Sequence, residues 1–233
     1  MYYGYSYMDP TQIVLMLLIS IVPLYASLKV QRAFEKYSRV RSLAGYTGDE
    51  AARRILMIHS LGAVTIRPIA GSMTDHYNPL AKEVALSQTV YGQNTISAIS
   101  VAAHEVGHAL QDANGYAFLR LRHKVYPVTS FASKWSIPMI VGGILIGMTS
   151  FTTLGIVLFS ITTLFALLTL PVEFNASTRA MKALRTSGVL SEEELEGARE
   201  VLNAAALTYV AAAAVSIMSL LRFLLIFNNQ DRD

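Results

Sequence analysis

Long uncharged runs dominate the pattern of hydrophobic and polar positions along this chain. The first covers residues 11–28, the second runs from about 136 to 171, and the third covers about 204–227 with one charged residue, Arg222. A helix needs about 20 apolar residues to cross the hydrocarbon core of a membrane. The second run is long for one crossing and short for two, so we expect a hairpin of helices near 133–149 and 153–171. The pattern therefore predicts about four transmembrane helices.

Mixed patterns fill the region between the first two runs and predict a small α+β unit. Thr47 and Glu50 form a capping box that opens a helix over 49–61, which Gly62 would end. The β-branched stretch 64–69 is typical of a strand. A weakly alternating stretch is predicted to form an edge strand, with residues Glu83, Val84, Ala85, Leu86 and Ser87.

Two further helices follow from local signals. The periodicity of residues 95–113 is helical, and Asn114-Gly115 supplies a stop. Ser191 with Glu194 forms a second capping box, and the helix that it opens is expected to run on into the last apolar run.

The fold class predicted from these patterns is a mostly α membrane protein with about four transmembrane helices and a small α+β, zincin-like catalytic region. Its expected organisation has five parts. They are an N-terminal membrane anchor (1–28), a catalytic region (29–132), a hydrophobic helical hairpin (133–171), a segment with a third-ligand helix and a capped helix (172–203), and a C-terminal membrane helix and tail (204–233).

Composition supports the membrane assignment and narrows the chemistry. Charged residues make up 15% of the 233-residue chain, against roughly 25% in average soluble domains. The chain has no cysteine, which excludes disulfides, thiolate zinc sites and cysteine nucleophiles. No block of Lys or Arg stands out, so we expect no nucleic-acid partner. The N-terminal sequence MYYGYSYMDP has no basic region and no small-residue cleavage site, so we expect no cleaved signal peptide.

The basic residues predict the orientation of the chain in the membrane. Positive residues collect on the cytoplasmic side of membrane helices. None precedes the first run, and five follow it at once, namely Lys29, Arg32, Lys36, Arg39 and Arg41. The charges flanking the second run agree with a hairpin that returns to the same side. We therefore expect a multi-pass protein of the plasma (inner) membrane whose catalytic face is cytoplasmic.

The sequence His104-Glu105-Val106-Gly107-His108, inside the helix predicted over 95–113, carries the chemistry. Residues four apart lie on the same helix face, so both histidines can bind one Zn²⁺. Glu105 lies beside the metal, where its carboxylate can take a proton from a zinc-activated water. Gly107 is costly within a helix, which indicates that another backbone approaches closely there.

A catalytic zinc has a third protein ligand. Glu173, directly after the second apolar run, is our choice, because an unpaired carboxylate would be costly there. His76 is the alternative ligand. It could instead contact the substrate or donate a hydrogen bond to the oxyanion, and so could Tyr77.

These motifs together resemble the YugP-type membrane zinc metallopeptidases of bacteria. The resemblance covers nearly the whole chain through TDHYNP, KEVALS, VAAHEVGHALQ and PVEFNAS. More distantly, the second half is similar to the gluzincins, in which a glutamate on a later helix completes the zinc site. The gluzincin pattern is Glu-x-x-Ala-Asp, and this chain has Ser177 in place of the aspartate. The resemblance therefore implies a ligand role for Glu173, but it implies no supporting role of the aspartate. The resemblance also implies that Glu83 to Ser87 hold an extended substrate.

The predicted function is that of a membrane-anchored zinc metalloendopeptidase with one Zn²⁺ per chain and a peptide or protein substrate. Two alternatives stay open. One is an intramembrane protease of the site-2 type, although the chain lacks a Leu-Asp-Gly motif. The other is a membrane scaffold with a non-catalytic metal site, which would not need Glu105.

Overall fold

The computed structural model describes residues 10–230, so the prediction about a signal peptide concerns residues that lie almost entirely outside the described part. Within this part the helices are α1 (Pro10–Ser38), α2 (Gly48–Ile58), α3 (Ile96–Ala113), α4 (Ala117–Ile146), α5 (Thr149–Ser187) and α6 (Glu192–Gln230), and the strands are β1 (Thr65–Ile69), β2 (His76–Asn78) and β3 (Glu83–Ser87). The expected mostly α architecture with a small α+β unit is confirmed.

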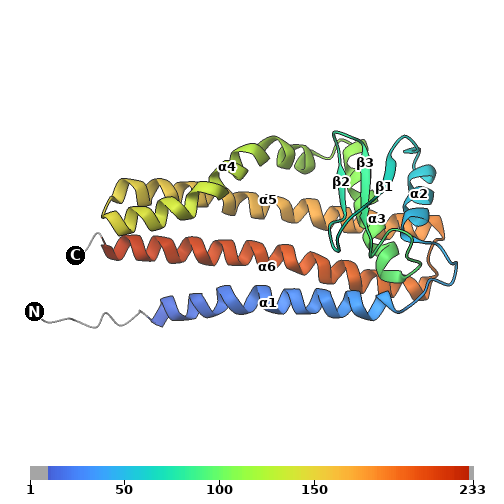
Figure 1. The fold of residues 1–233 in the computed structure, drawn as a ribbon, viewed down its shortest axis with the longest axis horizontal. Helices are drawn as coiled ribbons and strands as arrows, with labels where there is room; N and C mark the ends of the chain where they lie inside the picture. The colour runs from blue at the N-terminus through green and yellow to red at the C-terminus, as the bar shows by residue number, and fades with distance from the viewer. Residues whose placement is uncertain (1–9, 231–233) are drawn as a thin grey trace, which may run out of the picture.

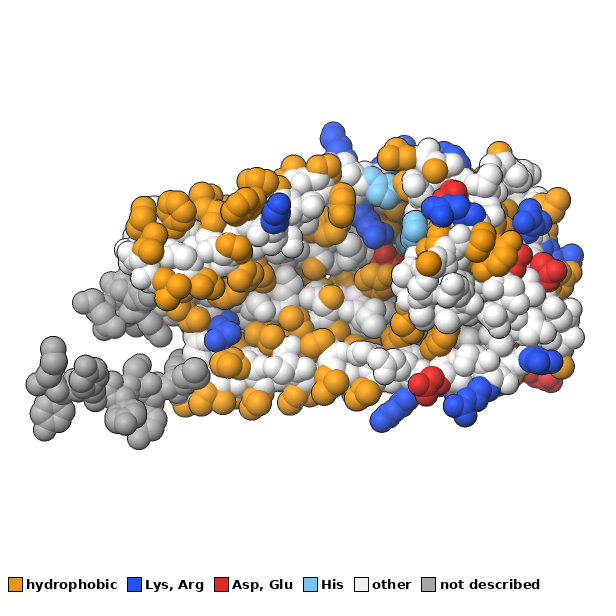
Figure 2. Space-filling view, in the orientation of Figure 1, with side chains coloured by type: hydrophobic (Ala, Val, Ile, Leu, Met, Phe, Trp, Pro, Cys, Tyr) orange, Lys and Arg blue, Asp and Glu red, His pale blue; other side chains and the backbone are white. Residues whose placement is uncertain are grey.

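Four long helices lie in a row, in the order α4, α5, α6 and α1 (Figure 1). Each is long and apolar enough to cross a membrane. The sheet, α2 and α3 lie together at one end of this row, and the described chain begins and ends at the other. Charged side chains gather at the sheet end, whereas hydrophobic side chains cover the long helices (Figure 2). The four predicted membrane helices are therefore present, and the side of the membrane that the sheet end faces stays a prediction.

The α4–α5 hairpin turns earlier than predicted. Gly147 ends α4 in the left-handed conformation (φ +70°) and Met148 caps α5, so Thr149 already belongs to the helix. The two helices pack closely at Gly143 and Gly155. A Cβ at Gly155 would lie 2.7 Å from the backbone nitrogen of Ile140. A Cβ at Gly143 would lie 2.5 Å from the backbone nitrogen of Thr152, whereas a Cβ at Gly142 would meet nothing within 4 Å.

Both predicted capping boxes are present. Glu50 N–H donates to Thr47 Oγ1, and Thr47 N–H donates to Glu50 Oε2. Ser191 and Glu194 exchange the same pair of bonds at the start of α6. Helix α2 ends before the predicted Gly62, because Ser60 adopts a left-handed conformation (φ 59°). The chain reversal at Ser60 lets Leu61 N–H donate to Leu56 O, which closes the last turn.

The predicted edge position of Glu83–Ser87 is wrong. The strand order is β1-β3-β2, so β3 is the central strand, paired in parallel with β1 and antiparallel with β2. Val84, Ala85 and Leu86 are fully buried, and Asp75 Oδ1 accepts the N–H of Ser87. Because the main chain of β3 is bonded on both sides, this strand cannot hold an extended substrate by main-chain hydrogen bonds.

Helix α3 forms the centre of the sheet end of the molecule. Thr95 caps it, as the helix predicted over 95–113 requires, and Asn114 follows its last residue. It packs against α2, α5, α6 and the sheet, and most of its side chains are buried. Helices α5 and α6 are continuous across residues 171–172 and 203–204. Each therefore connects an apolar run with the sheet end of the molecule.

Candidate metal centre

Helix α3 meets α5 at Gly107, where the two backbones come close. A Cβ at Gly107 would lie 3.1 Å from the carbonyl carbon of Ala176 and would collide with the carbonyl oxygen. The close approach predicted for Gly107 is thus confirmed. It sets His104 and His108, one turn apart on α3, against the turn of α5 that carries Glu173.

Three donor atoms converge between the two helices. Nε2 of His104 lies 3.2 Å from Oε2 of Glu173, and Nε2 of His108 lies 3.5 Å from the same oxygen. One donor atom from each residue lies within 4.8 Å of the others. Glu173 is 2% exposed. Because burying a charge is costly unless it is paired, this carboxylate needs polar or ionic partners.

Gln111 determines which ring nitrogen of His108 carries the proton. Its amide nitrogen donates to Val172 O at 2.7 Å and to Asn175 Oδ1 at 3.1 Å. Its amide oxygen therefore faces Nδ1 of His108, at 3.0 Å, and accepts a hydrogen bond from it. A proton on Nδ1 leaves a lone pair on Nε2, the atom that faces Glu173.

Ser177 makes the corresponding contact with His104. Its Oγ lies 3.2 Å from Nδ1 of His104, one helical turn after Glu173 on α5. Sequence reasoning assigned no supporting role to this position, because the aspartate of the family pattern is replaced by serine, yet the structure places Ser177 in contact with His104. A hydroxyl here contacts the histidine in the way that an outer carboxylate or carbonyl orients a metal-binding histidine.

Arg122 of α4 holds the other oxygen of Glu173, with Nη1 2.9 Å from Oε1. The two carboxylate oxygens thus have separate partners, Arg122 on one and the histidine pair on the other. Burial lowers the pKa of the His108 imidazole, but the hydrogen bond with Glu173 and the charges of Glu105 and Glu173 outweigh it, so the pKa is raised. The two carboxylates therefore favour a positive charge at His108, which a proton on Nε2 or a metal ion bound there would supply.

The donor set fits zinc. In a tetrahedral site with ligands about 2.0–2.1 Å from the metal, donor atoms are separated by about 3.3 Å. The two distances to Oε2 of Glu173, 3.2 and 3.5 Å, bracket this value. Two imidazoles and one carboxylate are also the ligand types of known catalytic zinc sites. His104, His108 and Glu173 are therefore the residues that would hold the ion.

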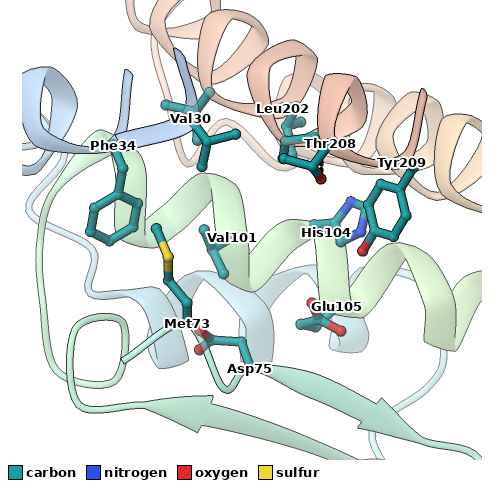
Figure 3. A pocket seen from close by; sticks show the side chains of 12 residues that line it. Val30, Phe34, Met73, Asp75, Val101, His104, Glu105, Leu202, Thr208 and Tyr209 are labelled. Carbon is teal, nitrogen blue, oxygen red and sulfur yellow. Dashed lines mark hydrogen bonds between the residues drawn. The ribbon is translucent and has the colours of Figure 1, made fainter. Parts of the chain in front are cut away.

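A cavity of about 310 Å³ opens beside this cluster (Figure 3). Helix α3 contributes Val101, His104 and Glu105, and α6 contributes Tyr209, whose ring lies beside His104. Glu105 is 8% exposed, and none of the described residues donates a hydrogen bond to its carboxylate. A buried carboxylate next to the donor cluster and facing a cavity is suitably placed to exchange a proton with a molecule bound there.

Two of the predicted substrate contacts lie elsewhere. The Tyr77 hydroxyl donates to Asp112 Oδ2 at 2.7 Å, and burial together with this bond raises the pKa of the phenol. His76 is exposed, its Nδ1 lies 2.9 Å from Thr74 O, and it does not belong to the donor cluster. Neither residue lines the cavity beside Glu105. The strand Glu83–Ser87, also predicted to contact substrate, is excluded by its central position.

Sequence reasoning gave no role in this site to four residues, which are Gln111, Arg122, Ser177 and Tyr209. Two had a local signal. Gln111 lies three residues after His108 on the same helix face, and Ser177 lies four after Glu173. Arg122 and Tyr209 come from helices far apart in the sequence and had no such signal.

The fold and the site define a membrane protein with a buried His-His-Glu cluster of the type that binds catalytic zinc. The family described as "Putative neutral zinc metallopeptidase" matches residues 12–228. The chain belongs to this family. It is 52% identical over 205 residues to the "Putative membrane protease YugP" of Bacillus subtilis (strain 168), which covers 88% of this chain and 91% of that protein. No solved structure matches the chain significantly.

Gly107→Ala is expected to destabilise the protein. Alanine gains about 1 kcal/mol of helix propensity, but overpacking a tight contact costs about 1–3 kcal/mol, and the backbone of Ala176 cannot rotate away. The measurement is thermal unfolding in detergent together with zinc content. Gly142→Ala is the matched control, since that mid-helix glycine has no neighbour within 4 Å. Equal melting temperatures for the two variants would contradict the proposed role of the Gly107 contact.

Ser177→Ala is expected to weaken zinc binding by about 10–100-fold, the usual effect of removing a residue that orients a ligand. Titration against a competing chelator measures this. Thr178→Ala is the control, because its exposed hydroxyl bonds only to Phe174 O. Ser177→Asp, which supplies another acceptor, is expected to retain most of the affinity. If Ser177→Ala bound zinc like the native chain, the contact with His104 would have no role in metal binding.

Proposed function

We propose that this protein is a zinc-dependent endopeptidase that hydrolyses peptide bonds at the membrane surface. The observation that carries the proposal is the convergence of His104 and His108 Nε2 on one oxygen of Glu173, with Glu105 in the adjoining cavity. Membership of a zinc peptidase family supports the reaction type.

Each residue then has a distinct part in the reaction. Zinc bound by three protein ligands lowers the pKa of a water molecule to about 7 and polarises a carbonyl group. The Glu105 carboxylate accepts the proton of the attacking water as the new C–O bond forms. It passes this proton to the amide nitrogen as the C–N bond breaks.

Tyr209 is proposed to stabilise the developing oxyanion. It lines the same cavity as His104 and Glu105, and its hydroxyl is a neutral donor at physiological pH, since an ordinary phenol has a pKa of about 10. A donor that approaches from α6, opposite Glu105 on α3, can bind the carbonyl oxygen while the carboxylate acts on the water.

The position of α3 favours a site at the membrane surface over the intramembrane alternative. Helix α3 is not among the candidate membrane spans within residues 10–230, and it packs beside the sheet at the charged end of the molecule (Figures 1 and 2). The basic residues that follow the apolar run of α1 lie towards the same end. We therefore propose that the catalytic end faces the cytoplasm, at the plasma membrane.

The decisive experiment is proteolysis of fluorescently labelled casein by the detergent-purified protein. We expect cleavage that 1,10-phenanthroline abolishes and that added zinc restores after the chelator is removed. Cleavage that resists the chelator would indicate a contaminating protease or another mechanism. A zinc-loaded protein that leaves unfolded casein intact would contradict a general endopeptidase and favour the scaffold alternative.

A further inference from the structure

A second cavity continues from the candidate active site towards the apolar end of the molecule. It has a volume of about 350 Å³, against about 310 Å³ for the cavity beside Glu105. Both are lined by Val30 of α1, Thr208 of α6 and Met73 from the segment before β2. Because they share three wall residues, we treat them as two parts of one α1–α6 groove.

The second part of the groove is apolar. Its walls are mostly small side chains, from Pro23, Ala26, Ser27, Val30 and Gln31 on α1, Thr208, Ala211, Ala212 and Val215 on α6, and Met73. None of these lining residues carries a charge, whereas the first part contains Asp75 and Glu105. Gln31 Nε2 lies 3.4 Å from Ser27 Oγ, so part of the polar lining is paired within the protein. One groove thus has a polar catalytic end and an apolar end.

The apolar end lies within the membrane-facing part of the helices. On α1, Pro23 and Ala26 belong to the uncharged run that ends before Lys29. On α6, Ala211 and Val215 lie about 10–17 Å beyond Ala204, where that apolar run begins, at 1.5 Å per residue. Helix α1 lies at one end of the row (Figure 1), so one wall of the groove borders the lipid.

The contacts between α1 and α6 change along the length of the two helices. At the catalytic end, Lys36 Nζ and Tyr37 Oη contact Glu200 Oε2 at 2.8 and 2.6 Å. Gly197 lets the Tyr37 ring approach, since a Cβ there would lie 2.6 Å from Cε1 of the ring. Towards the membrane, small residues replace this contact on both helices. The groove therefore lies where the sequence places small residues on both helices, between the polar contact at Glu200 and the apolar ends of α1 and α6.

We propose that the substrate is a membrane protein whose transmembrane segment packs its side chains into the apolar end of the α1–α6 groove. The polar stretch next to that segment then lies beside His104 and Glu105, where it is cut. This rests on the proposed peptidase function and adds the class of substrate. The continuity of the two cavities supports it, because a chain bound at Glu105 can extend into the second cavity without leaving the groove.

Kinetics with two matched substrates test the proposal. One is a polar peptide that the protein cuts from casein, and the other is the same peptide joined to a Leu/Ala helix of about 20 residues. We expect kcat/KM for the joined substrate to be at least about tenfold higher in lipid vesicles, an increase typical of filling an apolar pocket. Ala212→Phe, which fills the groove from an exposed position away from Glu105, should remove most of this advantage.

Val210→Phe is the matched control. Val210 is exposed on the same helix and lines neither cavity, so its replacement should leave both substrates unaffected. Equal kcat/KM for the two substrates in the native chain would overturn the proposal while the peptidase function stands. Equal effects of Ala212→Phe and Val210→Phe would also overturn it. No cleavage of either substrate would contradict the peptidase function itself.

Cross-linking tests the groove without catalysis. The chain has no cysteine, so a single introduced thiol reports on one place. In a Glu105→Gln background and with an added thiol oxidant, Ala212→Cys is expected to form a disulfide with a cysteine in the Leu/Ala helix of the joined peptide at least about tenfold faster than Val210→Cys, as an apolar pocket would favour. Equal rates would mean that the helix has no preference for the groove, and would overturn the proposal.

Discussion

Replacing Glu105 by glutamine is expected to lower the rate of casein cleavage by about 10²–10⁴-fold, the range that a general base contributes. Glutamine has the same shape as glutamate but cannot accept the proton of the attacking water at neutral pH. Glu105 is not part of the donor cluster, so the variant should still bind about one zinc per chain. Cleavage rate and zinc content, measured on the same preparation, check both expectations.

The controls for Glu105→Gln separate catalysis from stability. Glu35→Gln changes an exposed glutamate of α1 and should have native activity. Glu105→Asp keeps a carboxylate but withdraws it by one methylene, and should retain more activity than glutamine. If Glu105→Gln lost its zinc, Glu105 would belong to the metal site. If it cleaved casein at the native rate, the proton would be transferred by another residue.

Glu173→Gln is expected to abolish zinc binding. The substitution removes the carboxylate on which both histidine Nε2 atoms converge, and it leaves Arg122 beside a neutral amide. The loss of affinity should exceed the about 10–100-fold effect expected of a residue that only orients a ligand. Metal analysis of the detergent-purified variant, beside the native chain, measures it.

Stability provides a second readout of the same prediction. A ligand bound only to the folded state stabilises it by about 2.7 kcal/mol at a concentration 100 times its Kd. A chelator should therefore lower the melting temperature of the native chain and leave that of Glu173→Gln unchanged. Glu173→Gln combined with Arg122→Gln tests whether the unpaired arginine adds to the loss of stability. His76→Ala should keep its zinc, and zinc that depended on His76 and not on Glu173 would reverse the ligand assignment.

Local sequence signals predicted most of the fold because they depend on residues within one or two turns. The capping boxes at Thr47 and Ser191 and the stop after Ala113 place helix ends through neighbouring backbone groups. The errors have local causes as well. Ser60 ended α2 before the more obvious Gly62, and the hairpin needed only Gly147 and Met148 for its turn.

The strand Glu83–Ser87 shows where local pattern is insufficient. Its alternation suits any strand that is partly buried, and it does not say how many neighbours pair with it. Strand order depends on partners before it in the chain, β1 in parallel and β2 in antiparallel orientation. Only the assembled sheet shows that β3 is central and that β1 and β2 form the edges.

The sequence by itself determined the four apolar helices, the HEVGH helix and the choice of His104, His108 and Glu105, because each depends on composition or on a spacing of four residues within one helix. Only the tertiary structure decided that Glu173, 69 residues from His104, completes the cluster with Ser177, and that Arg122 and Tyr209 adjoin it. The same holds for the α1–α6 groove. Contacts between distant helices depend on which surfaces pack together, and here the absence of a Cβ at Gly107 and at Gly197 controls how closely they approach.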